Sequence, residues 1–231
     1  MSETLLMWLE IGFDLAYLIT IWALLAVMYK KRNKVMPANK KVAGLIRWMF
    51  LFLAIGDTGH VGFRVLAYTR GPLENSPLLV GLGSLATAYT VTLFYMIFVT
   101  VWRERFNKPA SWFTWLLLII GILRMIIMAL PGNQWGQVFP PQPMGILRNI
   151  PLMIQGLGIL ILILWSSVQK KDKTFIWIGC CIFLSFLFYT PVIFFVNQIP
   201  LLGMLMMPKT MAYLAIAFIA LFSLYPKNQR Y

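Results

Sequence analysis

Seven apolar runs, each long enough to cross a lipid bilayer, constrain this chain more than any other feature of its sequence. A membrane-spanning helix needs about 20 mostly apolar residues. Of the 231 residues, 60% are hydrophobic and 12% are charged, a charged share about half that of soluble domains. We therefore expect an all-α, polytopic membrane protein with a single domain over residues 1–231 and helices at 5–29, 43–68, 78–102, 111–130, 146–168, 174–197 and 200–224.

The cations are distributed by connection, although the formal net charge is +13. Every second connection is basic, whereas the opposite connections contain Arg70 as their only cation. The positive-inside rule then predicts an outside N-terminus and a cytoplasmic C-terminus in a plasma membrane. This distribution argues against nucleic acid as a partner and favours membrane lipids. The basic connections contain Lys30, Lys31, Arg32, Lys34, Lys40, Lys41, Arg47, Arg103, Arg105, Lys108, Lys170, Lys171 and Lys173, and the tail contains Lys227 and Arg230.

The second run contains an acid, the only histidine and an arginine at bilayer depth. Asp57, His60 and Arg64 are spaced i, i+3 and i+7, so a helix places all three on one face. An ionisable residue inside the membrane is costly and indicates a functional site. The alternative is a static network between helices that fixes their packing. Gly56, Gly59 and Gly62 favour a close approach of a neighbouring helix.

Polar residues of the other runs reach the same depth, given a rise of about 1.5 Å per residue. The predicted layer lies roughly 4–6 Å to the outer side of the bilayer midplane on that rise. Towards the basic connections the runs are mainly apolar, which argues against a conduction path. The layer contains Asp14, His60, Thr87, Arg124, Tyr189 and Lys209, with Gln155 close to it and Asp57 just beneath.

The charges of the outer half do not balance. Three acids, Glu10, Asp14 and Asp57, stand against four cations, and a buried charge needs a partner. We expect a small anionic or amphiphilic ligand in an outward-facing polar pocket of a sensor or binding protein; if Arg148 is interfacial, the imbalance disappears. The expected ligand-binding residues are Asp14, Asp57, His60, Arg64, Arg124, Gln155, Tyr189 and Lys209.

A metal-independent enzyme acting on a lipid is an alternative. Asp57 and His60 are the candidate catalytic residues, since a carboxylate beside an imidazole can act as a general base. Seven-helix hydrolases of the alkaline ceramidase and adiponectin-receptor type hold zinc with several histidines, whereas this chain has one histidine and two cysteines. We therefore expect no metal site.

A further alternative is a photoreceptor. Seven helices, an outside N-terminus, Tyr189 with Pro191, and Lys209 resemble the architecture of microbial rhodopsins. That resemblance implies retinal bound to Lys209, with Asp14 or Asp57 as the counter-ion. The run at 78–102, however, lacks the arginine and carboxylate of that family.

Three segments resemble a group of bacterial seven-helix membrane proteins without an assigned function. They are Gly56 to Arg64, Arg148-Asn149-Ile150-Pro151 and Met207-Pro208-Lys209-Thr210. The resemblance spans nearly all seven helices and implies the fold but no activity. We also expect Pro208 to interrupt the last helix beside Lys209.

The longest outer connection runs from Pro131 to Met144. It contains Trp135, Phe139 and Pro140, residue types that are common at the level of the lipid headgroups. It is either a lid or a stiff loop, and we favour the stiff loop.

Overall fold

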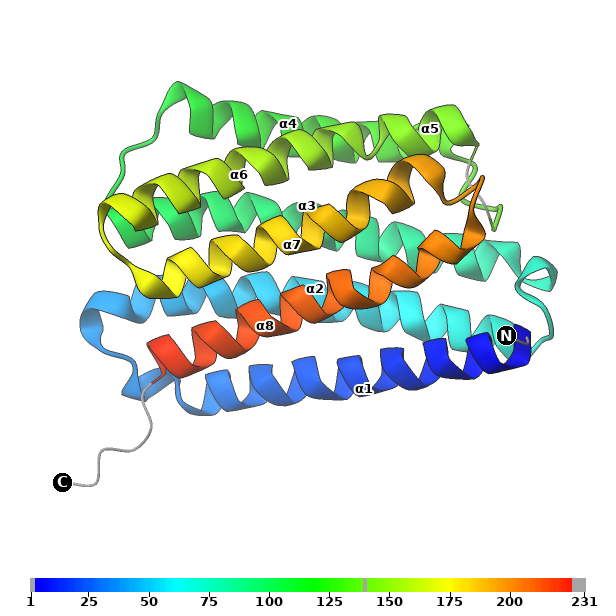
Figure 1. Ribbon diagram of the computed structural model, residues 1–231, viewed down its shortest axis with the longest axis horizontal. Coiled ribbons are helices and arrows are strands. Elements are labelled where there is room, and N and C mark those ends of the chain that lie inside the picture. The colour runs from blue at the N-terminus through cyan, green and yellow to red at the C-terminus, as the bar shows by residue number, and fades with distance from the viewer. Residues whose placement is uncertain (1–2, 139–140, 226–231) are drawn as a thin grey trace.

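The computed structural model describes residues 3–138 and 141–225, and these segments contain helices and connections but no strand (Figure 1). Phe139, Pro140, Lys227 and Arg230 lie outside the described residues. The helices are α1 (Glu3–Lys30), α2 (Lys40–Tyr68), α3 (Pro77–Phe106), α4 (Trp112–Ala129), α5 (Gln142–Leu147), α6 (Ile150–Gln169), α7 (Lys173–Phe195) and α8 (Met206–Leu224). Short 3-10 helices are η1 (Arg32–Lys34), η2 (Pro37–Asn39), η3 (Leu73–Asn75), η4 (Pro131–Asn133) and η5 (Pro200–Leu205).

The described part of the chain contains seven helices that are long and apolar enough to cross a membrane. The predicted all-α architecture with seven spans is thereby confirmed, and the chain is a multi-pass membrane protein. Neighbouring helices in the sequence pack side by side, and α8 returns to contact α1 and α2. α3 contacts α6 as well as its neighbours α2 and α4, so it joins the two halves of the bundle.

The connections gather at two opposite ends of the bundle (Figure 1). The basic end carries the connections α1–α2, α3–α4 and α6–α7 and the last residue of α8, at the left of Figure 1. The N-terminal end carries the start of α1 and the other three connections. Asp172 caps α7 at the basic end and pairs with Arg105 at 2.7 Å, so this end is tied by contacts within the protein.

Two predicted helices differ from the structure. The run at 146–168 is divided into α5 and α6, because Pro151 has no N–H to continue the helical ladder back to the preceding turn. The run at 200–224 begins as η5, and its α-helix starts at Met206. Pro208 therefore lies in the first turn of α8, where a missing N–H costs little, and does not interrupt a longer helix.

The glycines of α2 form part of a close contact with α3. A Cβ atom at Gly56 would lie 1.7 Å from Oγ1 of Thr90, and one at Gly59 would lie 3.3 Å from Ala86. A Cβ at Gly62 would meet nothing within 4 Å. The predicted close approach is thus real for Gly56 and Gly59 but does not include Gly62.

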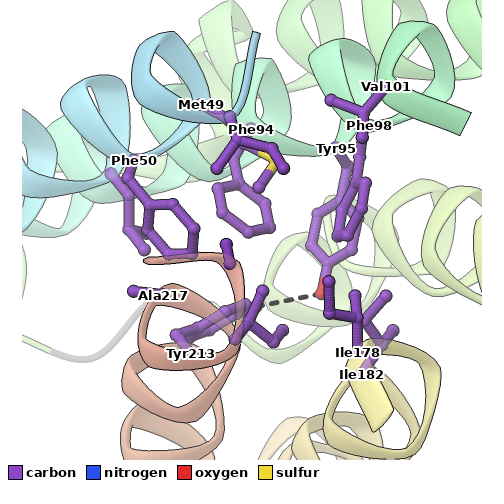
Figure 2. Packing of buried hydrophobic residues seen from close by; sticks show 14 of the residues in the cluster. Met49, Phe50, Phe94, Tyr95, Phe98, Val101, Ile178, Ile182, Tyr213 and Ala217 are labelled. Carbon is purple, nitrogen blue, oxygen red and sulfur yellow. Dashed lines mark hydrogen bonds between the residues drawn. The ribbon is translucent and has the colours of Figure 1, made fainter. Parts of the chain in front are cut away.

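Aromatic rings pack together in the buried core, and Figure 2 shows this packing between α2, α3 and α8. Phe94 is fully buried and makes edge-to-face contacts with Phe50, Tyr95 and Tyr213 at centroid separations of 5.3–5.6 Å. The hydroxyls of Tyr95 and Tyr213 are 3.0 Å apart, the dashed line in Figure 2. Such packing holds the Tyr213 ring in place, and Lys209 lies one turn before Tyr213 on α8.

Candidate functional site

The residues expected in one layer all lie in the half of the bundle nearer the N-terminal end, judged by their places along α1 to α8. The side chains, however, divide into an acid side and a cation side. The acid side comprises Glu10, Asp14, Tyr17, Asp57, Arg64 and Thr87 on α1, α2 and α3. The cation side comprises Thr92, Arg124, Arg148, Asn149, Tyr189 and Lys209 on α3, α4, α7 and α8 and at the α5–α6 break.

Asp57 is the best-satisfied charge of the acid side. Tyr17 donates its hydroxyl to Oδ2 of Asp57 at 2.5 Å, and Thr87 donates to Oδ1 at 2.6 Å. These three side chains join α1, α2 and α3. Hydrogen bonds to a charged group contribute about 1.5–3 kcal/mol each, so the hydroxyls stabilise the carboxylate where water is scarce.

Arg64 also has its partner on the acid side. Its Nε lies 2.6 Å from Oε1 of Glu10, and its Nη2 donates to Oε2 at 3.2 Å. This two-point pairing is the strong geometry for a guanidinium and a carboxylate. Arg64 therefore has its counter-charge within the protein, on α1. Asp14 lies within electrostatic range of Glu10, Arg64 and Asp57.

His60 lies at a close backbone approach of α2 and α3. A Cβ at Gly83 of α3 would come within 3.0 Å of the His60 carbonyl oxygen. Among the described residues, the buried Nδ1 of His60 has no hydrogen-bond partner. Both Asp57 oxygens accept from hydroxyls and neither accepts from His60. The carboxylate–imidazole pair required by the enzyme hypothesis is therefore not formed in this structure.

Arg124 is the most deeply buried cation of the cation side, with 3% of its surface exposed. Its Nε donates to the carbonyl of Arg148 at 3.0 Å. Its Nη1 donates to the carbonyl of Ala88 at 3.0 Å and to Oγ1 of Thr92 at 2.6 Å. All three acceptors are neutral. Within the described part of the chain, no carboxylate lies within ion-pair distance of this guanidinium.

Lys209 is the second buried cation of the cation side and lies against the ring of Tyr189. Its side chain is buried, and its ammonium lies 4.0 Å from the centre of the Tyr189 ring and 5.8 Å from that of Tyr213. The ammonium is within electrostatic range of Asp57 and of Arg124. The described residues give it neither a hydrogen bond nor an ion pair. Two tyrosine faces supply weaker stabilisation than a carboxylate in contact.

Tyr189 is close to the cations of this side. Its hydroxyl donates to Oδ1 of Asn149 at 3.1 Å, two residues before Pro191 in α7. Arg124 and Arg148 both lie within electrostatic range of the ring. One cation in contact with the ring and two more within electrostatic range of the phenol concentrate positive charge here, which favours an anion.

Gln155 is held apart from this cluster by its own contact. Its Nε2 donates to the carbonyl of Leu117 at 3.1 Å, and the described residues offer no partner to its buried Oε1. Gln155 therefore links α6 to α4, and none of its hydrogen bonds in the structure reaches Arg124, Lys209 or Tyr189.

The connection after α4 folds back over the N-terminal end. We call residues 131–138 the strap. Nε1 of Trp135 donates to the carbonyl of Met128 at 2.9 Å, and the guanidinium of Arg148 lies 4.2 Å from the centre of the Trp135 ring. Asn133 is fully buried and donates to the carbonyls of Ile127 and Leu130. The described part of the connection is therefore docked against α4 and Arg148, which is compatible with the stiff loop that we favour.

Several contributing residues were not among the expected ligand-binding set. Tyr17 lies three residues after Asp14, and Tyr213 lies four residues after Lys209. Helical spacing alone places each on the same face as the charge that precedes it. No such signal exists for Thr92 or Asn149, because their contacts depend on how separate helices are rotated.

The described residues contain no group of three or more His, Cys, Asp or Glu side chains able to hold a metal ion. Once Glu10 and Arg64 are paired, two acids, Asp14 and Asp57, remain against three cations, Arg124, Arg148 and Lys209. The site can therefore balance its charge by taking one negative charge. Comparison with protein-family models, with curated proteins and with solved structures finds no match for this chain, so its function rests on this geometry.

Proposed function

We propose that this protein binds a small anionic or amphiphilic ligand at the cation side, as a sensor or binding protein of the plasma membrane. In this proposal the N-terminus lies outside and the C-terminus in the cytoplasm, because cations concentrate at the basic end. The ligand then enters from the outer surface or from the outer leaflet of the bilayer.

The surroundings of Arg124 carry the proposal. The guanidinium of Arg124, a residue with 3% of its surface exposed, donates to three neutral oxygens and contacts no carboxylate of the described chain. Removing an ion from water costs several kcal/mol, which neutral acceptors offset only in part. An anion against Arg124 supplies the missing part.

Lys209 and Tyr189 define the rest of the binding chemistry. A carboxylate or a phosphate accepts in two places from a guanidinium and as a point charge from an ammonium. Thr92 and the carbonyl of Ala88 occupy one edge of the Arg124 guanidinium through Nη1. The anion is therefore expected at Nη2, since the hydrogen bonds within the protein use Nε and Nη1.

Native mass spectrometry of the purified protein tests the proposal. We expect a copurifying anion whose occupancy falls at least tenfold in Arg124→Gln and in Lys209→Met. Arg70→Gln is the matched control, because Arg70 is exposed in the connection between α2 and α3 and outside the site. Circular dichroism and gel filtration establish that each variant is folded.

Two outcomes reject the proposal. One is a wild-type protein that carries no anion and gains none when carboxylates or phosphates are added. The other is an occupancy that falls equally in Arg70→Gln, since that result describes attraction to net positive charge and no defined site. If Arg124→Gln does not fold, Lys209→Met alone decides between these results.

A further inference from the structure

A second small site lies under the strap. Gly81 and Ser84 of α3, Asn133, Trp135 and Gln137 of the strap, and Arg148 line a hollow with a cavity volume of about 20 Å³. A cavity of this size holds about one water molecule or one oxygen of a larger group. Gln134 lines it too, and both Gln134 and Gln137 are exposed, so the hollow lies at the surface of the N-terminal end.

The hollow depends on close seating of the strap on α3. A Cβ atom at Gly81 would lie 1.5 Å from the carbonyl oxygen of Trp135 and 2.5 Å from its carbonyl carbon. The strap therefore reaches this position only because residue 81 has no side chain. Trp135 then covers Arg148, whose guanidinium lies 4.2 Å from the ring centre.

Two buried atoms of the lining residues have no hydrogen-bond partner among the described residues. They are Nη1 of Arg148, which is a donor, and Oδ1 of Asn133, which is an acceptor. The orientation of the Asn133 amide is fixed, because its Nδ2 donates to the carbonyls of Ile127 and Leu130 at 2.6 and 3.0 Å. A group that satisfies both atoms must accept from arginine and donate to an amide oxygen.

The charge of the lining separates the possible occupants. Arg148 is the only charged residue among those that line the hollow, and no carboxylate of the described chain lies within ion-pair distance of it. A halide accepts from Arg148 but leaves Asn133 unsatisfied and repels its oxygen. Water satisfies both atoms but leaves the positive charge. An oxyanion that retains one hydroxyl proton accepts from Arg148, donates to Asn133 and neutralises the positive charge.

We propose that this hollow binds a small oxyanion that carries one hydroxyl, of which hydrogen carbonate is the smallest. One of its oxygens occupies the cavity and accepts from Nη1 of Arg148, its hydroxyl donates to Oδ1 of Asn133, and the remainder faces the exposed side. The site is separate from that of Arg124, because Arg124 contacts the backbone carbonyl of Arg148 and not its guanidinium. An anion held by Arg148 would also balance the charge count of the cation side, so the proposed function then rests on the surroundings of Arg124 alone. The two proposals are tested at different residues, Arg148 and Gly81 here against Arg124 and Lys209 there.

Thermal unfolding in lipid nanodiscs at mildly alkaline pH tests this site, with hydrogen carbonate, chloride and nitrate compared at equal ionic strength. We expect hydrogen carbonate alone to raise the melting temperature, by about 3 °C at tenfold excess over its Kd. Arg148→Gln should abolish the rise. Gly81→Ala should abolish it as well, because it displaces the strap without changing any charge.

Gly12→Ala is the control, since a Cβ atom there meets nothing within 4 Å; it should keep the full rise. Equal shifts with chloride overturn the requirement for a hydroxyl. No shift with any anion means that the hollow holds only water, and also overturns the proposal. Binding of ¹³C-labelled hydrogen carbonate, followed by its contact to ¹⁵N-labelled arginine in solid-state NMR, gives the same decision if a variant does not fold.

Discussion

The acid side and the cation side face each other across α3, and they satisfy their charges differently. On the acid side Asp57 accepts from two hydroxyls, and Glu10 pairs with Arg64 through two contacts. On the cation side Arg124 donates only to neutral oxygens, and Lys209 lies against tyrosine rings. Neighbouring residues of α3 serve the two sides, since Thr87 binds Asp57 and Ala88 accepts from Arg124.

That difference shows which charged side chains have partners within the protein and which do not. A protein that needed only rigid packing would place its acids against its cations, because each uncompensated buried charge costs several kcal/mol. Here Glu10 and Asp57 find their partners on the acid side, whereas Arg124 and Lys209 have no carboxylate of the described chain in contact and are open to an anion. The separation depends on α3 remaining tightly packed against α2.

The largest expected effect breaks this separation directly. Gly56→Ala places a methyl group 1.7 Å from Oγ1 and 2.7 Å from Cβ of Thr90, so α2 and α3 must move apart. We expect a loss of about 3 kcal/mol of unfolding free energy, as for severe overpacking, measured by denaturant unfolding in detergent. Gly62→Ala on the same helix meets nothing within 4 Å. If both variants lose the same free energy of unfolding, the close contact between α2 and α3 at Gly56 does not determine the stability.

The next effect concerns the acid side alone. Tyr17→Phe removes one of the two donors to Asp57, and a hydrogen bond to a charged group contributes about 2 kcal/mol. The free energy of unfolding should fall by that amount, while ligand occupancy at the cation side should stay unchanged. An unchanged free energy of unfolding would indicate that water replaces the phenol and therefore reaches the Asp57 carboxylate.

The smallest effect concerns the Glu10–Arg64 pair. The two side chains are 31% and 26% exposed, so solvent and salt screen their attraction. Glu10→Gln should therefore cost about 0.5–1 kcal/mol at low ionic strength and less at high salt. A loss as large as that of Tyr17→Phe, or one independent of salt, would show that the pair is more deeply buried in the membrane-embedded protein.

Depth along each helix could be predicted from the sequence, whereas rotation about each helix axis could not. Counting residues placed Asp57, Thr87, Arg124, Tyr189 and Lys209 in one half of the bundle, as the structure has them. The same count says nothing about which neighbour a side chain faces, so the partner of Arg64 on α1 was missed.

The N-terminal end was predicted least well. Pro151 and Pro208 were visible in the sequence, but the break before α6 and the 3-10 start of the last span depend on which carbonyls the chain can satisfy locally. Docking of the strap depends on Gly81, a residue of another helix. No local pattern relates Gly81 to Trp135, because their contact is tertiary.

The most direct test of the account is an experimental structure of the protein purified from its own membrane with its bound molecules retained. We predict non-protein density in hydrogen-bond contact with the Arg124 guanidinium and within 4 Å of the Lys209 ammonium. Anion binding at the cation side is contradicted if that position is empty and a carboxylate of Asp14 or Asp57 lies in ion-pair contact with Arg124 or Lys209 instead.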